Sequence, residues 1–319
     1  MTNEIPELSN LQTIRQGIKV RKLVDRIFEI VALGSLFSTL GILLVLIAKL
    51  LVEGGRRFSN GFIEFITSVP DSNPEQAGIK IAIVGSFLVI LVTASIAVPL
   101  GIGAGIYLEE YAKKNWFSNV IEINISNLAG VPSIIYGLLA LGIFKAQLKL
   151  GETIITAGLT LALLILPIII VTTREAIKAI PQSLREGVYA IGASRWQTIY
   201  DHILPASAGG ILTGIIVGLS RAIGEAAPLV TIGALTFLTF LPPVPFAPKP
   251  DGGFVGPFAW LFSPFTVMPI QVFDWVGRPD PGFNVVNAGA AAVVLVLMTL
   301  SMNALAIYLR IYFRKRVKW

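Results

Sequence analysis

An arginine and a glutamate four residues apart stand in an apolar stretch, and they are the residues of this sequence best suited to handling an ion. The two residues, Arg221 and Glu225, stand at the end of a series of small residues at every fourth position, namely Ala206, Gly210, Gly214, Gly218 and Ala222. This spacing places side chains on one helix face, which another helix can approach closely. A charge at membrane depth costs about 2.5–3.5 kcal/mol, so the pair should face protein or water. We expect Arg221 and Glu225 to serve a solute path or a gate, with a purely structural ion pair as the alternative.

The chemistry open to such a pair is recognition of an anion. A guanidinium is planar and always charged, and its donors match the oxygens of a phosphate, although sulfate or another oxyanion would fit as well. The chain has no cysteine and one histidine, His202, so these residues alone cannot form a zinc site. No glycine is followed by a lysine, which excludes a Walker A phosphate loop. We therefore expect a non-catalytic chain that binds no metal.

A polar segment before this helix carries two helix-start signals. Ser183–Glu186 and Ser194–Gln197 both fit the Ser-x-x-Glu/Gln capping box, in which side chains bond the free amides of a helix start. Gly192 supplies a left-handed stop between the two helices, and Pro205 is expected to end the second. One face of each helix is apolar, through Leu184, Val188, Ile191, Trp196, Ile199 and Ile203. Helices this short are marginal alone in water, so the hairpin must dock on the rest of the chain or on another protein.

The composition indicates an integral membrane protein. Of the 319 residues, 54% are hydrophobic and only 14% are charged. An α-helix needs about 20 apolar residues to cross a bilayer. Six stretches meet this need, namely 27–52, 79–108, 120–144, 153–173, 206–238 and 285–309. Pro132 is expected to kink the third span. The aromatic segment 241–283 shows no obvious secondary structure, and it could cap a path, receive a partner or pack on the scaffold. The sequence thus predicts an all-α polytopic fold.

The distribution of lysine and arginine predicts the orientation. With both termini in the cytosol, sixteen of these residues lie inside and six outside. The inside residues are Arg15, Lys19, Arg21, Lys22, Arg26, Lys113, Lys114, Arg174, Lys178, Arg185, Arg195, Arg310, Arg314, Lys315, Arg316 and Lys318, and the outside ones are Arg56, Arg57, Lys145, Lys149, Lys249 and Arg278. The positive-inside rule then favours cytosolic termini and a cytosolic hairpin. Membrane lipid is an expected partner, and nucleic acid is not.

The hairpin resembles a known pattern. Glu186-Gly187-Val188, then Gly192, Arg195 and finally Leu204-Pro205 are similar to the EAA loop of ABC importer permeases, although that family has alanines after the glutamate. The resemblance implies that this loop is the docking helix for a cytosolic ATPase subunit. It therefore assigns ATPase coupling to Glu186, Gly187, Gly192, Arg195, Leu204 and Pro205.

A wider resemblance covers most of residues 60–319. Thr172-Thr173, Pro181, the run Gly192–Thr198, Gly214, Arg221–Leu229 and Pro264–Trp275 are similar to phosphate-specific ABC importer permeases, and Ala227-Pro228-Leu229 favours the A-type subunit. Many relatives carry an arginine directly before the Thr-Thr pair, where this chain has Val171. Whether Arg174 substitutes for that arginine is an open question.

The wider resemblance implies a type I ABC importer permease with the MetI-like fold in a bacterial inner membrane. The partners it implies are a second homologous permease, an ATPase dimer that holds ATP and magnesium, and an external phosphate-binding protein. It assigns Arg221 to the phosphate path. A permease for another oxyanion and an ion-coupled secondary transporter are the alternatives, although the inverted repeat common in the latter class is not evident.

The expected organisation has three parts. Residues 1–26 form a cytosolic segment, 27–309 the membrane domain and 310–319 a basic cytosolic tail. The family core is expected at about 79–309, with the coupling loop at 174–205. The first span is longer than the apolar core of a signal peptide, so we expect it to remain as an anchor.

Overall fold

The computed structural model describes residues 6–59, 61–113, 115–248 and 253–316, with the side chains of 18, 21–59, 61–113, 115–248, 253–308, 310 and 311. The long elements in these ranges are all helices, and extended segments pair there only at the bridges Thr153–Pro264 and Pro248–Phe254. The chain divides into two units, residues 1–52 and 53–319. The all-α fold expected from the sequence is confirmed.

The first unit consists of most of one long helix. Helix α1 runs from Pro6 to Ser59, and its segment Arg21–Ser59 is long and apolar enough to cross a membrane. The helix continues through residue 26 without a break. Residues 6–20, which precede the first span, are therefore part of the same helix as the span.

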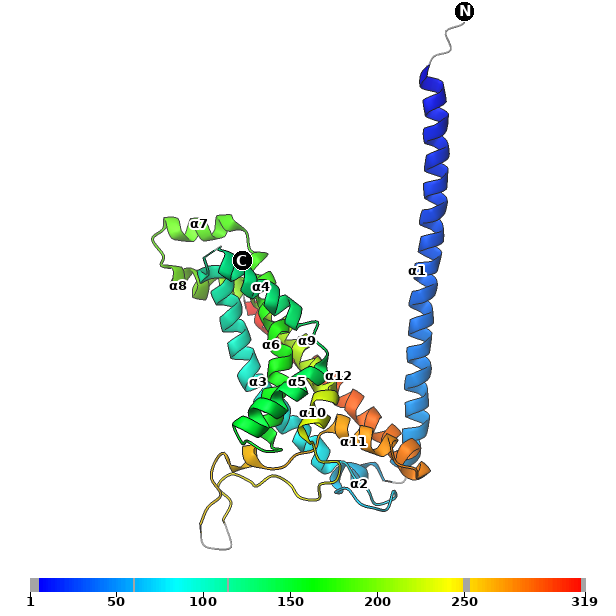
Figure 1. Ribbon diagram of the computed structural model, residues 1–319, viewed down its shortest axis with the longest axis vertical. Coiled ribbons are helices and arrows are strands. Elements are labelled where there is room, and N and C mark those ends of the chain that lie inside the picture. Colours follow the sequence, from blue (N-terminus) through cyan, green and yellow to red (C-terminus); the bar gives the residue numbers. More distant parts are fainter. Residues whose placement is uncertain (1–5, 60, 114, 249–252, 317–319) are drawn as a thin grey trace, which may run out of the picture. The chain divides into compact units, whose positions relative to one another are not determined.

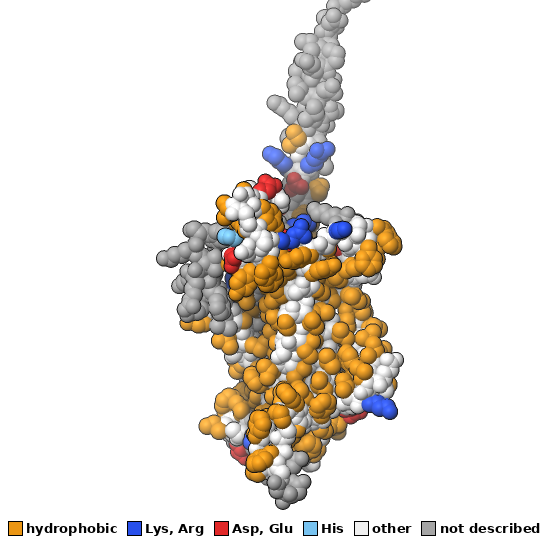
Figure 2. Space-filling view, turned by 90° about the vertical axis from the view of Figure 1, so that its left-hand side faces the viewer, with side chains coloured by type: hydrophobic (Ala, Val, Ile, Leu, Met, Phe, Trp, Pro, Cys, Tyr) orange, Lys and Arg blue, Asp and Glu red, His pale blue; other side chains and the backbone are white. Residues whose placement is uncertain are grey.

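The second unit contains four more helices of spanning length. They are α3 (Lys80–Ile106) with the π-helical turn η1 (Tyr107–Tyr111), α6 (Ile154–Lys178), α9 (Leu204–Gly224) preceded by α8 (Arg195–Gln197) and η3 (Thr198–Ile203), and α12 (Ala288–Arg316) preceded by η5 (Gly282–Asn287). Helix α6 packs against both α3 and α9, and α12 packs against α9 (Figure 1). Figure 2 shows apolar side chains over the trunk of this unit and charged ones gathered toward its ends, as a membrane protein requires.

The third predicted span is a broken pair of helices. Helix α4 (Trp116–Leu128) is followed by α5 (Ser133–Ala140) and the π-helical turn η2 (Leu141–Gln147), and the two halves differ in direction by 105°. Pro132 caps α5 with an extended backbone, since its ring and missing N–H cannot continue α4. The kink predicted at this proline is confirmed. The described residues thus hold five candidate spans, or six if this pair counts as one.

Helix α6 lies at the centre of the core, and α3 and α9 pack closely against it at positions where they carry small residues. A Cβ added at Gly105 of α3 would lie 2.7 Å from the Thr173 Cβ, and one added at Gly214 of α9 would lie 1.9 Å from the Thr172 hydroxyl oxygen. Such distances leave no room for a methyl group, so the recurring small residues of α9 form the contact with α6 that their spacing predicts.

A second apolar cluster closes the end opposite the hairpin. Trp275 of α11 (Met268–Val276) lies 6.1 Å from Phe65 of α2 (Phe62–Thr67) and 5.9 Å from Phe283, measured between ring centroids. The segment 241–283 therefore has more structure than expected, because it contains α11 and the short turn η4 (Ala259–Phe262). Burial of Trp275 explains why this helix forms, since it anchors one face of α11 in the scaffold.

Candidate functional site

The pair Arg221–Glu225 lies where the fifth span breaks. Helix α9 ends at Gly224, and Glu225 leaves it with an extended backbone, φ −83° and ψ 114°. The Arg221 Nε still donates to the Glu225 Oε1 over 3.3 Å. The side chains are 38% and 20% exposed, so neither is sealed in the core of this chain.

The expectation of one unbroken helix from 206 to 238 was wrong. A short helix, α10 (Ala227–Ile232), follows the break with Pro228 in its first turn, and it stops at Gly233, which has a left-handed backbone. Pro228 favours ending α9 at Gly224, because a proline has no N–H for a helical bond and its ring would clash with the carbonyl of the residue four positions earlier. Non-helical backbone at membrane depth occurs only where protein or water covers it, so this break marks a special position.

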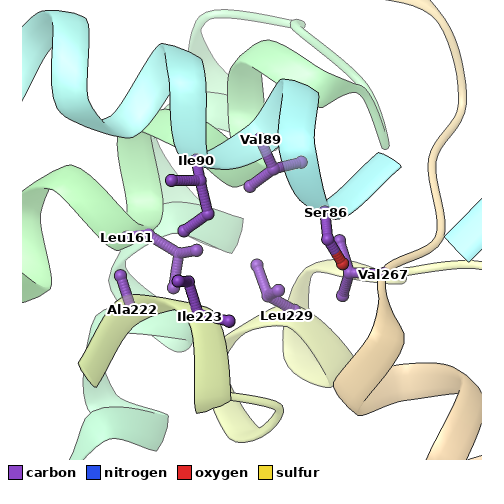
Figure 3. A pocket seen from close by; sticks show the side chains of 8 residues that line it. All are labelled: Ser86, Val89, Ile90, Leu161, Ala222, Ile223, Leu229 and Val267. Atoms are coloured by element: carbon purple, nitrogen blue, oxygen red, sulfur yellow. The ribbon is translucent and has the colours of Figure 1, made fainter. Parts of the chain in front are cut away.

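The other side of α9 at this level is packed core. Ala222 and Ile223, next to Arg221 in the chain, are buried and line a cavity of only about 10 Å³ together with Leu161 and Leu229 (Figure 3). That volume is about what one water molecule occupies. This side of α9 is therefore packed, and the side that carries Arg221 is the partly exposed one.

Helix α5 is held against the break from the other direction. A Cβ on Gly137 would come 2.7 Å from the Cα of Pro228, so the two backbones are in direct contact. The neighbouring Tyr136 donates its hydroxyl to the carbonyl oxygen of Leu128 over 2.8 Å. The kinked third span and the broken fifth span therefore support one polar locus.

At the hairpin end, Arg174 is bound by two carboxylates. Its Nη1 lies 2.9 Å from the Glu122 Oε1 of α4, and its Nη2 lies 3.4 Å from the Glu109 Oε2 of η1. A guanidinium shared by two carboxylates has little positive field left for an anion. Arg174 thus ties together the ends of three elements beside the hairpin, and its geometry gives no support to a substrate role.

A second ion pair joins the hairpin to the same turn. Arg185 of α7 (Gln182–Ala190) donates through Nη2 to the Glu110 Oε1 over 2.9 Å, and it also donates to the carbonyl oxygens of Ile177 and Ile180 at the end of α6. The two side chains are only 12% and 7% exposed. Sequence reasoning missed this pair, because 75 residues separate its members and only the short charged run Glu109–Glu110 hinted at it.

The hairpin itself confirms one capping box and not the other. Ser194 and Gln197 bond each other's backbone amides as predicted, and Gly192 has a left-handed φ of 89°. The box at Ser183–Glu186 is absent, because α7 starts at Gln182 after Pro181, two residues before the Leu184 start that an N-cap at Ser183 would give. Pro181 has an extended backbone and sets the start of the helix in place of the serine side chain.

The expectation that Pro205 ends the second hairpin helix was also wrong. The helical segment from Arg195 continues through Leu204 and Pro205 to Gly224. In the π-helical turn η3, directly before Leu204, each hydrogen bond joins residues five apart, and not four apart as in an α-helix. This wider turn accommodates a residue that lacks an N–H, so the proline needs no chain break.

The apolar residues of the hairpin divide into two sets. Ile199 and Ile203 are fully buried against Ile177 and Ile180, which docks the hairpin on the end of α6. Ile191 and Trp196, which were expected on that same face, are instead largely exposed. Trp196 stacks on exposed Tyr200 with ring centroids 6.1 Å apart.

The residues assigned to coupling do not form one cluster. Glu186 and Gly187 are exposed on α7, while Leu204 and Pro205 are half-buried at the start of α9. The guanidinium of Arg195 lies 5.7 Å above the ring of Tyr111. The exposed part of the hairpin, made of Glu186, Gly187, Ile191, Trp196 and Tyr200, is hereafter called the hairpin tip.

Comparison with known proteins places these features in a family. Residues 97–245 match the family described as "Binding-protein-dependent transport system inner membrane component". The chain is 32% identical over 253 residues to the phosphate transport system permease protein PstA of Haemophilus influenzae, a match that covers 79% of this chain and 81% of that protein. It is 43% identical over 166 residues to the PstA of Yersinia pestis, where it spans 56% of the relative's length and 52% of its own.

A likeness in fold supports the same placement. A chain from the crystal structure of a bacterial alginate ABC transporter, in complex with an alginate pentasaccharide-bound periplasmic protein, superposes with a TM-score of 0.62 at 13% identity. The superposition covers 88% of this chain and 94% of that one. The helices around α6 therefore follow the architecture of an ABC transporter.

Proposed function

The chain belongs to the family of binding-protein-dependent transport system inner membrane components, and on that premise we propose that it is the A-type permease subunit of an ATP-driven importer of inorganic phosphate. In this function it forms half of the path across the bacterial inner membrane, with both termini in the cytosol. A homologous permease forms the other half, and an external binding protein delivers phosphate. An ATPase dimer holds ATP and magnesium, and this chain is not an enzyme.

The observation that carries the substrate assignment is the Arg221–Glu225 pair at the helix break. The Arg221–Glu225 pair lies beside the packed core, and both of its side chains remain partly exposed. A second permease subunit would cover this side and enclose the arginine. We assign Arg221 to the phosphate path, where its planar donors bind the oxyanion, and Glu225 to holding the guanidinium in register.

Uptake by a purified complex tests this function. The permease pair, the ATPase and the binding protein are reconstituted in liposomes, and uptake of radioactive phosphate is measured with and without ATP. We expect uptake that requires ATP and that an equal concentration of sulfate does not inhibit. Uptake driven by an ion gradient without ATP would indicate a secondary transporter, and full replacement of phosphate by sulfate would indicate a different oxyanion.

The same proposal makes the hairpin tip the docking surface for the ATPase. Ile191, Trp196 and Tyr200 are large apolar side chains left in water, whereas the opposite side of the hairpin is packed on α6. Exposed aromatic residues of this kind are enriched at protein interfaces. Trp196 and Tyr200 of the tip lie on the helical segment that continues into α9, so a partner bound to them acts directly on α9.

A single cysteine tests docking and orientation together, because the natural chain has none. Ile191→Cys is expected to react with a membrane-impermeant thiol reagent in inside-out vesicles stripped of the ATPase. Rebinding the ATPase should lower the labelling rate by about tenfold, since the tip is then covered. Ser72→Cys, at an exposed position of the outer connector, is the control and should label only in right-side-out vesicles.

A bulky residue at Gly187 gives a second test of ATPase docking at the hairpin tip. A Cβ at Gly187 meets no atom within 4 Å, so Gly187→Trp should leave the permease folded while blocking a partner. Loss of the ATPase from the purified complex is the expected result. Unchanged co-purification, together with equal labelling of Ile191→Cys with and without the ATPase, would contradict the docking proposal.

A further inference from the structure

A pocket of about 630 Å³ opens at the end of the second unit opposite the hairpin. Its walls come from three segments that are distant in sequence. Arg56 and Arg57 stand at the end of α1, Glu75 and Gln76 belong to the connector before α3, and Asn287 lies at the start of the last span. None of these residues takes part in the Arg221 locus or the hairpin, so the pocket is a separate feature of the molecule.

Arg57 is the unusual member of this pocket. Its side chain donates through Nη2 to the carbonyl oxygen of Glu75 over 2.7 Å and to that of Ala77 over 3.4 Å, and its guanidinium lies 5.2 Å from the ring centroid of Phe65. The residue is only 4% exposed, and its Nε has no hydrogen-bond partner among the described residues. No carboxylate in the described part of the chain forms an ion pair with it. A buried charge left in this state is costly unless another group compensates it.

Asn287 supplies a second, independent signal. It is 1% exposed and donates its side-chain amide to the carbonyl oxygen of Pro74 over 2.8 Å, which leaves its Oδ1 without a donor. A fully buried acceptor without a donor is unfavourable, because it has lost its hydrogen bonds to water. The pocket is thus lined by a buried guanidinium whose Nε lacks an acceptor and, from another element, by an amide oxygen that lacks a donor.

The charge and polarity of the rim favour an anion. Arg56 and Gln76 are exposed and add further donors, while the carboxylate of Glu75 is the acidic group among the lining residues. Two arginines against one glutamate leave a net positive charge. A ligand that satisfies both buried groups must carry anionic oxygens for Arg57 and an O–H or N–H for Asn287.

We propose that this pocket binds a phosphate group that also carries a hydrogen-bond donor. Monoprotonated inorganic phosphate has both functions in one ion, with oxygens for the guanidinium and a P–OH for the Asn287 Oδ1. An outer-leaflet lipid whose headgroup joins a phosphodiester to hydroxyl or ammonium donors has the same chemistry. The inference does not rest on the proposed transport of phosphate, because a lipid would occupy the pocket of any transporter with these residues.

Two measurements on the whole transporter complex distinguish the sources. In nanodiscs of phosphatidylcholine, whose headgroup lacks such donors, binding of radioactive inorganic phosphate is measured by equilibrium dialysis. In nanodiscs that also contain phosphatidylglycerol and phosphatidylethanolamine, native mass spectrometry counts the lipids that stay bound after transfer to detergent. Binding of free phosphate in the first experiment, or retention of lipid in the second, identifies the source.

Variants then locate the binding. Arg57→Gln should weaken the retained ligand by about tenfold or more, as expected for losing hydrogen bonds to a charged group. Arg56→Gln, at an exposed position where folding is not at risk, should weaken it by severalfold. Lys149→Gln, which removes an exposed outer cation away from the pocket, should have no effect.

Folding is checked by thermal unfolding of each complex, and Arg57→Lys replaces Arg57→Gln if the latter does not fold. If neither phosphate binding nor lipid retention responds to Arg56→Gln or to the folded Arg57 variant, the pocket holds water only and the proposal is wrong. A response to Lys149→Gln equal to that of Arg56→Gln would also overturn it, because binding would then follow surface charge alone.

Discussion

Replacing Arg221 with glutamine is expected to lower ATP-driven phosphate uptake by about tenfold to a hundredfold while the complex still assembles. The loss in uptake follows from hydrogen bonds to a charged group, which are worth about 1.5–3 kcal/mol. Assembly should survive because both side chains of the pair are partly exposed, and such pairs contribute about 1 kcal/mol or less to stability. Uptake in reconstituted liposomes and the yield of intact complex are the two measurements.

Companion variants separate recognition from scaffolding. Arg221→Lys should recover only part of the uptake, since a point charge lacks the planar fork of a guanidinium. Arg278→Gln is a matched control, because Arg278, just after α11, forms a similar i, i+4 pair with Asp274 of α11 over 2.8 Å. This control should transport at a rate close to that of the natural chain. If Arg221→Gln combined with Glu225→Gln assembles and transports normally, the pair is structural and its assignment to the path fails.

The second large effect is expected at Arg185. Arg185→Gln leaves the carboxylate of Glu110 buried without its partner, and breaking a buried pair in this way costs about 3–5 kcal/mol. The hairpin would also lose its bonds to the carbonyl oxygens of Ile177 and Ile180. We expect a lower unfolding temperature and, if an ATPase docks on the hairpin tip as proposed, less phosphate transported for each ATP hydrolysed, because its motion would no longer reach α3 and α6 fully.

Removal of both charges distinguishes stability from coupling. Glu110→Gln with Arg185→Met should recover much of the unfolding temperature, since no charge is left buried alone. It should not recover the transport per ATP, because the connection between α7 and η1 is still missing. Lys145→Gln breaks the more exposed pair with Glu152 and serves as the control, with little effect expected on either quantity. An Arg185→Gln complex that behaves like this control would show that the hairpin is not coupled through Glu110.

The sequence predicts local geometry well where one residue type decides it. Pro132 breaks the third span because proline cannot donate within a helix, and the small residues of α9 contact α6 because their spacing fixes one face. Gly192 and the box at Ser194 mark the hairpin turn for equally local reasons.

Features that depend on tertiary contacts were beyond sequence reasoning. Pro205 has the same chemistry as Pro132, yet the π-helical turn before it keeps the helix continuous. Arg185 finds its carboxylate 75 residues away, and no periodicity indicates such a pair. Ile191 and Trp196 match the apolar pattern of their helices but remain exposed, because the pattern does not distinguish apolar residues that pack on the chain from those that do not.

One continuous helical segment, from Arg195 to Gly224, connects the hairpin to the Arg221–Glu225 pair, so a tilt at one end moves the other end. At a rise of about 1.5 Å per residue, the 26 residue steps from Arg195 to Arg221 span roughly 39 Å. A rigid rod of that length that pivots by about 5° at the hairpin carries its far end sideways by roughly 3 Å, about the length of one hydrogen bond. If the hairpin docks an ATPase and Arg221 binds the ion as proposed, a small rotation at the hairpin would make or break the hydrogen bonds of Arg221 to that ion without a relay of intermediate side chains.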